Sequence, residues 1–378
     1  CEKWELMKPL TEDQDVYPMW VADMELPVCD EVIEAISKRL KCPIFGYTMP
    51  KQSLYDSICE WHNRRYDYGM DESDICFSTS VLSTLSLMLR MFTEKGDKVI
   101  VPTPHYYQFC KKIKMAEREV LAVPLKCKAH RYVFDFEELE KVVDDQTKLL
   151  ILCNPHNPSG TIYTKEELEE VSDFCQKHKL MIFSDEIHMD VVFHQQKIIP
   201  FMTISDYAKN HTISAISISK TFNLAGMKIS CAIIKNPSIR EAFKVQASSH
   251  GMASINLLAY EAMEASYRHG DAWLEEALNY IEHNRQYAVS FIEKDIPSLK
   301  THLSDATYFL WVDFRESGLP THQLKEILLK EAKVLISDGS EFHKEYIGFV
   351  RFNLSCPKQA VVDVFNRIKV VVDQYQKR

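Results

Sequence analysis

The sequence predicts an α/β protein, with a mainly parallel sheet flanked by helices and a smaller α+β domain beside it. Three observations lead to this fold class. Short apolar runs that stop at polar residues alternate with helical stretches through the middle of the chain. After about residue 255 this alternation ends, and a long helical region precedes separate strand candidates. With 378 residues, the chain is also long enough for two domains, or for one large α/β domain with an appendage.

Six apolar runs are predicted to form strands of the main sheet. Most of them are short and continuously apolar, which is typical of strands buried on both faces. Because helical stretches separate the runs, the chain shows β-α-β alternation, and this implies parallel strands with helices on both sides of the sheet. The predicted strands are residues 98–102, 119–125, 148–154, 180–186, 212–219 and 229–235.

Two helices of this region are predicted from the way they begin. Thr164 is placed to cap a helix over 164–179, and acidic residues in its first turn suit the positive end of the helix dipole. Residues 76–90 are predicted as a short strand followed by a helix, and the beginning of this helix is rich in serine and threonine. Free backbone N–H groups at such a start can hold a phosphate without a glycine-rich loop, although many such starts are caps with no ligand.

The C-terminal third is predicted to build the smaller domain. Its expected elements are a helical region at 257–295, strands at 307–314 and 347–355, and a helix at 321–333. The N-terminal segment up to about residue 30 is able to join them. We therefore predict a large α/β domain over 30–270 and a small α+β domain built from 1–29 and 271–378.

Composition and charge exclude several classes of protein. Hydrophobic residues are 46% and charged residues 26% of the chain, the balance of a globular protein. The formal charge of -9 argues against a nucleic-acid partner, because phosphate binding relies on a basic face. No run of about 18 apolar residues predicts a membrane span, and the first ten residues lack the apolar core of a signal peptide. We expect a cytoplasmic protein, with a segment upstream of Cys1 because the chain does not begin with Met.

The 11 cysteines are scattered and form no C-x-x-C pair. This spacing predicts reduced, mostly buried thiols. Structural zinc sites need cysteine or histidine pairs two to five residues apart, and most histidines here stand alone. We predict no metal site.

Polar residues follow several predicted strands at their carboxyl ends, where open α/β sheets bind ligands. Asp185 ends one strand and Lys220 follows the next, while the turn at 154–160, with two Asn-Pro steps, holds Asn157 at the same edge. Each also has an ordinary interpretation: Asp185 as a cap, Lys220 as a surface lysine, and the turn as a connector. Partial burial of Lys220 would lower its pKa and favour a Schiff base.

Together these residues form the pattern that pyridoxal 5'-phosphate (PLP) requires. PLP needs an amine for the Schiff base, a carboxylate for the pyridine nitrogen, a donor for the ring oxygen and a phosphate cup. Lys220, Asp185 and Asn157 match the first three needs. The expected phosphate cup consists of Ser217, Ser219 and Lys228 with the helix start at Val81 and Leu82.

The sequence resembles fold-type I PLP enzymes, the aspartate aminotransferase superfamily, over essentially its whole length. Within that superfamily it is most similar to the cystathionine β-lyase and cystalysin branch, the PatB/MalY-type C–S lyases. The resemblance implies a mainly parallel, seven-stranded type of sheet. It rests on "WVADME" (20–25), "FGYT" (45–48), "TPHYY" (103–107), "NPHNPSG" (154–160), "SDEIHMD" (184–190), "SKTFNLAGMK" (219–228) and "RFNLSCP" (351–357).

The resemblance also implies roles for aromatic and histidine side chains. Tyr106 matches the aromatic residue that stacks on the pyridine ring. His188 stands three residues after Asp185, where typical aminotransferases carry tyrosine, and histidine is characteristic of the lyase branch. Tyr47 matches a tyrosine that crosses to the phosphate of the neighbouring subunit, which implies a homodimer with shared active sites.

Further implied roles concern the substrate. Arg351 matches the arginine that binds the substrate α-carboxylate through two parallel hydrogen bonds. Asn157 and Ala22 are expected beside the substrate as well. Asp185 matches the partner of the pyridinium, and Lys220 matches the Schiff-base lysine and the base at Cα.

The function predicted from the sequence is a PLP-dependent C–S β-lyase. It would cleave cystathionine or a related cysteine S-conjugate to a thiol, pyruvate and ammonia. Two alternatives stay open at this point. One is a PLP-dependent aminotransferase, since the cofactor residues are common to both classes. The other is a regulatory protein that keeps the fold, against which the presence of Lys220, Asp185 and Arg351 argues.

Overall fold

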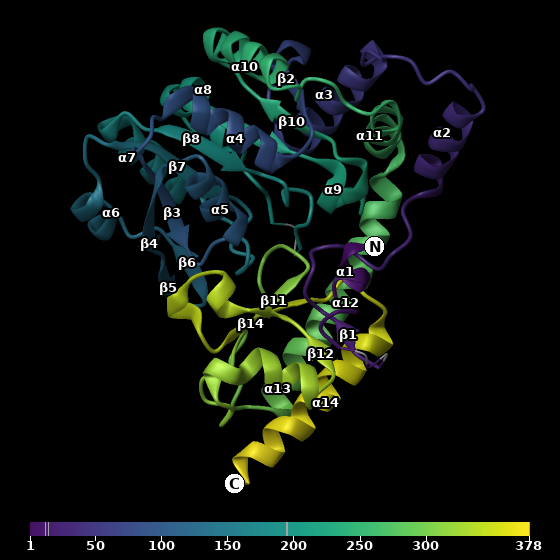
Figure 1. The fold of residues 1–378 in the computed structure, drawn as a ribbon, viewed down its shortest axis with the longest axis vertical. Coiled ribbons are helices and arrows are strands. Elements are labelled where there is room, and N and C mark those ends of the chain that lie inside the picture. The colour runs from purple at the N-terminus through teal and green to yellow at the C-terminus, as the bar shows by residue number, and fades with distance from the viewer. Residues whose placement is uncertain (12, 14, 194–195, 378) are drawn as a thin grey trace.

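The computed structural model describes residues 1–11, 13, 15–193 and 196–377. A seven-stranded sheet dominates the upper part of the molecule in Figure 1. Only β10 runs antiparallel to its neighbours, so the prediction of a mainly parallel sheet is confirmed. In spatial order the strands are β2 (Ile75–Ser78), β10 (Ser230–Ile233), β9 (Thr212–Ile216), β8 (Met181–Asp185), β7 (Thr147–Cys153), β3 (Lys98–Thr103) and β4 (Glu119–Pro124).

The two faces of this sheet are both covered, which explains the continuous apolar runs. Successive side chains of a strand point to opposite faces, so alternate residues of β3 and β7 belong to different apolar clusters. One cluster packs against α4 (Val81–Phe92), α5 (Tyr107–Met115) and α10 (Pro237–Ser249). The other packs against α7 (Lys165–His178) and α8 (Asp206–His211).

Strand β4 is an exception to the predicted burial on both faces. It lies at the edge of the sheet, and Glu119, Ala122 and Pro124 are exposed. An edge strand has a neighbour on one side only, so less of it is covered. Helix α7, in contrast, begins as predicted: the Thr164 side chain accepts from the Glu167 N–H, and Glu167 bonds back to the Thr164 N–H.

The lower part of the molecule contains a second, antiparallel sheet of β11 (Phe309–Asp313), β14 (Phe349–Asn353) and β13 (Ser337–Asp338). Near the N-terminus, β1 (Tyr17–Pro18) pairs with β12 (Val334–Leu335), so the N-terminal segment joins the C-terminal third of the chain here. The short strands β12 and β13 were not predicted. The domain limits at residues 30 and 270 stay a prediction.

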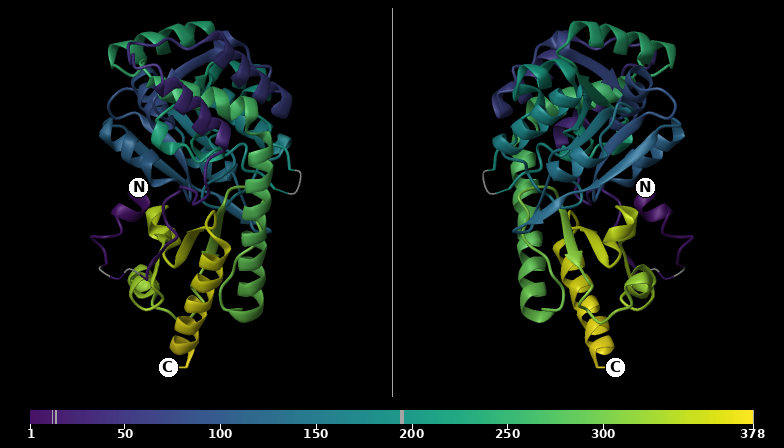
Figure 2. Two further views of the ribbon diagram at one scale, coloured as in Figure 1. Left: turned by 90° about the vertical axis from the view of Figure 1, so that its right-hand side faces the viewer. Right: turned by 90° about the vertical axis from the view of Figure 1, so that its left-hand side faces the viewer.

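The remaining elements complete this arrangement. The long helix α12 (Asp271–Asp295) extends from the upper to the lower part of the molecule, as Figure 2 shows. The other helices are α1 (Glu2–Glu5), α2 (Asp30–Leu40), α3 (Gln52–Tyr66), α6 (Phe136–Val142), α9 (Ile218–Thr221), α11 (Leu257–His269), α13 (Leu324–Lys330) and α14 (Lys358–Gln376). Strands β5 (Lys126–Lys128) and β6 (Arg131–Val133) form a hairpin. The 3₁₀ turns are Glu72–Asp74, Phe201–Thr203, Ala225–Met227, Thr321–Gln323, Gly339–Glu341 and Lys344–Tyr346.

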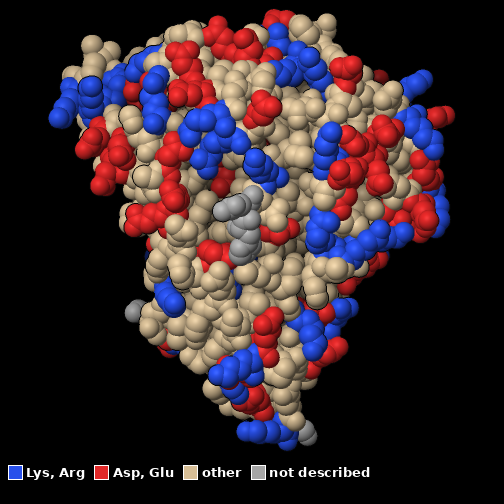
Figure 3. All heavy atoms as spheres, turned by 180° about the vertical axis from the view of Figure 1, so that it is seen from behind, with Lys and Arg blue, Asp and Glu red and all other residues tan. Residues whose placement is uncertain are grey.

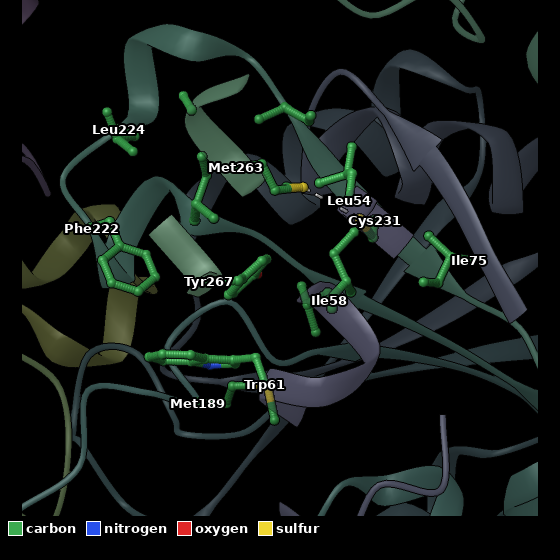
Figure 4. Close-up of a cluster of buried hydrophobic side chains, with 14 of the residues drawn as sticks. Leu54, Ile58, Trp61, Ile75, Met189, Phe222, Leu224, Cys231, Met263 and Tyr267 are labelled. Atoms are coloured by element: carbon green, nitrogen blue, oxygen red, sulfur yellow. Dashed lines mark hydrogen bonds between the residues drawn. The ribbon is translucent and has the colours of Figure 1, made fainter. Parts of the chain in front are cut away.

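A buried aromatic cluster anchors the chain just after Lys220. Figure 4 shows Phe222 and Trp61 beside Tyr267, and the Trp61 and Phe222 rings meet edge to face at 5.5 Å. Gly270, between α11 and α12, allows this close packing, because a Cβ atom there would lie 2.2 Å from the Phe222 ring. The helical region predicted at 257–295 is divided at Gly270 into two helices, α11 and α12. The cluster holds the chain that follows α9 in place.

The surface carries charges of both signs. On the face opposite to that of Figure 1, lysine and arginine side chains are interspersed with aspartate and glutamate, as Figure 3 shows. Among the described residues, no helix is both long enough and apolar enough to cross a membrane. The 11 cysteines are all free thiols, and Cys1, Cys42 and Cys127 are exposed.

Candidate active site

A cavity of about 210 Å³ opens at the carboxyl ends of β7, β8 and β9. The strand register brings these ends together, because Cys153 pairs with Asp185 and Asp185 pairs with Ala215. Twelve residues predicted for the site line this cavity: Ala22, Val81, Leu82, Tyr106, Asn157, Asp185, His188, Ser217, Ser219, Lys220, Lys228 and Arg351.

Tyr47 is the predicted site residue that does not reach the cavity. Its side chain is fully exposed, and it borders a separate surface hollow together with Met49 and Tyr55. The resemblance implied that this tyrosine serves the site of a second subunit. The placement on the surface leaves that expectation untested.

Lys220 lies on the one-turn helix α9 rather than at the end of a strand. Strand β9 stops at Ile216, and the Ser217 side chain caps α9 by accepting from the Ser219 N–H. This turn directs the Lys220 Nζ to the Ala22 carbonyl oxygen at 2.6 Å, with Asp23 Oδ1 3.8 Å away. Burial lowers the pKa of Lys220 to about 8, against the opposing influence of Asp23. A sizeable fraction of this amine is therefore neutral near physiological pH.

Asp185 is the last residue of β8, as predicted, and it is buried. Its Oδ1 accepts a hydrogen bond from the Ile187 N–H at 3.1 Å. Burial raises the pKa of this carboxyl to about 7, and the neighbouring Glu186 acts in the same direction. A cationic partner inside the cavity would restore the charged form.

The corner of the cavity that is predicted to hold the phosphate, here called the anion-binding corner, lies where two helices begin. Ser80 caps α4, so the N–H groups of Val81 and Leu82 at its first positions have no acceptor within the helix. The Ser217 Oγ lies 2.9 Å from the Ser219 Oγ, next to the start of α9. Lys228 lines the same cavity, with its backbone in the left-handed region at φ 55°. Hydroxyls, helix N-termini and a lysine together suit a phosphate group.

Arg351 lies in the cavity wall on β14, stacked at 4.0 Å from the centre of the Phe309 ring. Its guanidinium donates to Asn157 Oδ1 at 2.9 Å and to the Trp20 carbonyl oxygen at 2.9 Å. Among the described residues no carboxylate forms an ion pair with it, and its buried Nε has no hydrogen-bond partner. Burial lowers the pKa of Arg351 to about 10, so the group keeps its charge at neutral pH. A buried cation of this kind is suited to a carboxylate ligand.

Tyr106 and His188 supply rings to the cavity. Tyr106 precedes helix α5, and its ring contacts those of Tyr107 and Phe109 edge to face. His188 is buried against Tyr308 and Phe309, and its Nδ1 has no hydrogen-bond partner in the described part of the chain. Burial, with the cations Lys220 and Arg351 nearby, lowers the pKa of His188 well below its ordinary value. The imidazole is therefore neutral.

The residues present fit PLP. Two buried nitrogens of the cavity, His188 Nδ1 and Arg351 Nε, have no hydrogen-bond partner among the residues that the structure describes, as expected where a polar ligand belongs. Lys220 would hold the aldehyde carbon and Asp185 the ring nitrogen, while the serine and helix-start corner would hold the phosphate. Tyr106 and Asn157 would contact the ring and its oxygen. These individual roles stay predictions.

Two cavity-side residues were not singled out from the sequence. Asp23 approaches Lys220, and the Tyr308 hydroxyl donates to the Ala22 carbonyl oxygen at 3.0 Å. Asp23 stands inside the motif at 20–25, and Tyr308 inside a predicted strand. Neither the motif nor the strand indicates which way the side chain points, so local sequence alone did not identify them.

Behind the site, a buried carboxylate joins α9 to the core, and we expect it to stabilise the fold. Asp190 accepts from Trp61 Nε1 at 2.9 Å and from the Thr221 hydroxyl at 2.8 Å, and Tyr66 also donates to it. Asp190→Ala leaves the buried Trp61 and Thr221 donors without this acceptor and should lower the free energy of unfolding by about 3 kcal/mol, measured by chemical denaturation. Asp173→Ala, at an exposed position of α7, should change it by less than about 0.5 kcal/mol. Equal stability of the two variants would contradict the prediction.

Comparison with known proteins agrees with this geometry. The chain is 36% identical over 371 residues to cystathionine β-lyase PatB of Bacillus subtilis, covering 98% of this chain and 96% of that protein. It superposes with a TM-score of 0.96 and 33% identity on cystalysin from Treponema denticola, whose structure contains PLP, covering 99% and 96% of the two chains. A PLP-bound C–S lyase from Staphylococcus hominis matches with a TM-score of 0.91 and 29% identity, covering 98% and 95%.

These similarities confirm the predicted fold-type I architecture. The family model for aminotransferase class I and II matches residues 19–368. This range includes every residue that lines the cavity, from Ala22 to Arg351 in the sequence. The chain belongs to the aminotransferase class I and II family.

Proposed function

We propose that this protein is a cytoplasmic, PLP-dependent C–S β-lyase. Its substrate would be cystathionine or a related cysteine S-conjugate, and its products a thiol, pyruvate and ammonia. The observation that carries the proposal is a single cavity lined by a largely buried lysine, Lys220, and by a buried arginine, Arg351, that forms no ion pair with a carboxylate among the described residues. This pair suits an amino-acid substrate, because the carboxylate that Arg351 would bind and the Cα proton that Lys220 would remove lie close together in such a molecule.

The choice of a lyase rather than an aminotransferase has two supports. Relatives that cover nearly the whole chain carry the names cystathionine β-lyase and C–S lyase. The site also contains His188, the residue that the resemblance associates with the lyase branch. We therefore favour cleavage of the Cβ–S bond over amino-group transfer.

The described residues account for the steps that this chain has to perform. Arg351 binds the substrate carboxylate, and the stacked Phe309 and the Asn157 amide fix the plane of its guanidinium. Lys220 removes the proton from Cα with its neutral amine, after which the C–S bond breaks and sulfur leaves with the electron pair. Asp185 would hold the ring nitrogen of the cofactor and keep it protonated. When bound, PLP supplies the electron sink for the carbanion.

The deciding experiment is an assay of the purified, PLP-loaded protein with cystathionine and no keto acid. A lyase releases pyruvate and ammonia continuously under these conditions. An aminotransferase stops after one turnover and resumes only when a keto acid is added. Arrest after a single turnover would overturn the proposed function.

A conservative change at Arg351 tests the position of the substrate carboxylate. Arg351→Lys removes the two parallel hydrogen bonds but keeps the charge, and these bonds act in the ground and transition states alike. We expect the KM for cystathionine to rise about 10- to 100-fold with kcat nearly unchanged. The matched control is Arg315→Lys, which alters an arginine stacked on Phe349 outside the cavity. A drop in kcat at constant KM would contradict this assignment.

We further propose that the protein is a homodimer with shared active sites. The segment around Tyr47 supports this, because Ile44, Phe45, Tyr47 and Met49 are all at least 58% exposed in the single chain. Such a run of exposed apolar side chains is typical of an interface. A second copy that covers this segment would also bring Tyr47 to the phosphate end of the partner's cavity.

Tyr47→Phe tests this arrangement without changing the apolar surface. The loss of one hydrogen bond to a charged group should weaken PLP binding by about 1.5 to 3 kcal/mol, measured by titrating the apoprotein with PLP. Tyr280→Phe removes a hydroxyl from another part of the surface and should leave PLP binding unchanged. A fully active monomer in light scattering would refute the shared site.

A further inference from the structure

The Asp23 carboxylate faces the amine of Lys220 and has no other polar partner among the described residues. Its Oδ1 lies 3.8 Å from Nζ, and its side chain is 29% exposed. No hydrogen bond reaches either carboxylate oxygen in the described part of the structure. A largely covered aspartate that pairs with a single amine is expected to influence the position and the protonation of that amine.

The backbone holds this carboxylate in place. The Asp23 carbonyl oxygen accepts from Asn353 Nδ2 at 2.8 Å, and the same Asn353 amide bonds to the Val21 carbonyl oxygen at 2.7 Å. Between these two residues, Ala22 accepts from Lys220 and from Tyr308. The segment at 21–23 is therefore tied to β14 and α9 at once, and its geometry does not depend on the Asp23 side chain.

Four charged groups act on the Lys220 amine from different elements. Asp23 from the N-terminal segment and Asp185 from β8 favour its protonated form, while Arg351 on β14 and Lys228 after α9 oppose it. Asp23 is the only carboxylate within 4.0 Å of Nζ in the described chain. Its influence on the proton of Lys220 is the largest of the four.

We propose that Asp23 is a positioning residue, which holds the free amine of Lys220 beside the cavity and stabilises its protonated form. This inference rests on the proposed role of Lys220 as the base at Cα. In that step the Cα–H bond breaks, its electron pair stays with the substrate, and an N–H bond forms on Nζ. The resulting ammonium then faces a carboxylate 3.8 Å away instead of lying unpaired in a largely buried site.

Removing the charge of Asp23 changes the proton affinity of Lys220 in a definite direction. Without the carboxylate the ammonium form is less stable, so the pKa of Lys220 falls, by about 1 pH unit for a charge at this distance. Starting from a pKa of about 8, such a fall increases the neutral fraction of the amine at pH 7 about fivefold. The free amine is the form that reacts with acylating reagents.

The test measures Lys220 directly in the full-length protein after removal of PLP. Acetic anhydride labels neutral amines, and mass spectrometry of the Lys220 peptide gives the labelling rate between pH 6 and pH 10. Asp23→Asn should lower the midpoint of this titration by about 1 pH unit and increase the rate at pH 7 about fivefold. Asp23→Glu, which restores a carboxylate, should return the midpoint towards that of the wild type.

The matched control is Glu25→Gln. It removes the same charge two residues further along, where the carboxylate pairs with Lys3 at 2.6 Å rather than with Lys220. A midpoint that moves less than about 0.2 pH unit in Asp23→Asn, or equally in Glu25→Gln, would overturn the proposal. If Asp23→Asn does not fold, Asp23→Ser also removes the carboxylate, and its midpoint is compared with that of Glu25→Gln in the same way. This readout needs no turnover, so it is separate from the cystathionine assay that tests the proposed function.

Discussion

Lys220→Ala is expected to reduce the turnover of cystathionine by at least about 10³-fold. The variant loses the amine that would both attach the cofactor and remove the Cα proton, and general base catalysis alone contributes about 10²- to 10⁴-fold. No other described lysine replaces it, because Lys228, which also lines the cavity, belongs to the anion-binding corner. Pyruvate release, measured at saturating cystathionine and PLP, gives the effect.

The same variant has a spectroscopic signature. Wild-type protein should be yellow after loading with PLP, and Lys220→Ala should lose the visible absorption that depends on the bond to Nζ. Lys209→Ala, at an exposed position of α8, is the control and should keep both colour and activity. A colourless wild-type protein that does not take up PLP would refute the whole assignment.

Asp185→Asn is expected to lower kcat about 10²-fold and to leave the KM for cystathionine nearly unchanged. The carboxylate stabilises charge that develops only on the way to the transition state, so its removal affects the chemical step rather than substrate binding. The amide has nearly the same shape and can still accept from the Ile187 N–H. The loss of kcat therefore reports the missing negative charge rather than a change of fold.

A comparison with Arg351→Lys tests whether the two side chains act at different stages of the reaction. Steady-state kinetics should separate the two variants, with the main change in kcat for Asp185→Asn and in KM for Arg351→Lys. A common pattern in both variants would mean that the two side chains do not act at different stages. Melting temperatures of both should be measured alongside, since Asp185 and Arg351 are buried.

Much of the large sheet could be predicted from the sequence. Most of its strands are covered on both faces, so they appear as short, continuously apolar runs that need no distant contact to be recognised. The same local signal is weak for β12 and β13, which have only two residues each. It also did not distinguish β9 from α9, because Ile218 continues the apolar alternation after the strand has ended at Ile216.

The sequence by itself determined which residues are suited to the chemistry: Asp185 ends a predicted strand, and Lys220 and Asn157 follow predicted strands. The structure brings all three to one cavity. Ala22 and Arg351 were expected at the site from the resemblance, and both line the cavity. Only the tertiary structure placed Asp23 beside Lys220, because Asn353 on β14 holds the segment at 21–23 next to α9. Contacts between residues so far apart in the chain depend on the packing of the whole fold, and no local pattern encodes the direction of a side chain such as Asp23.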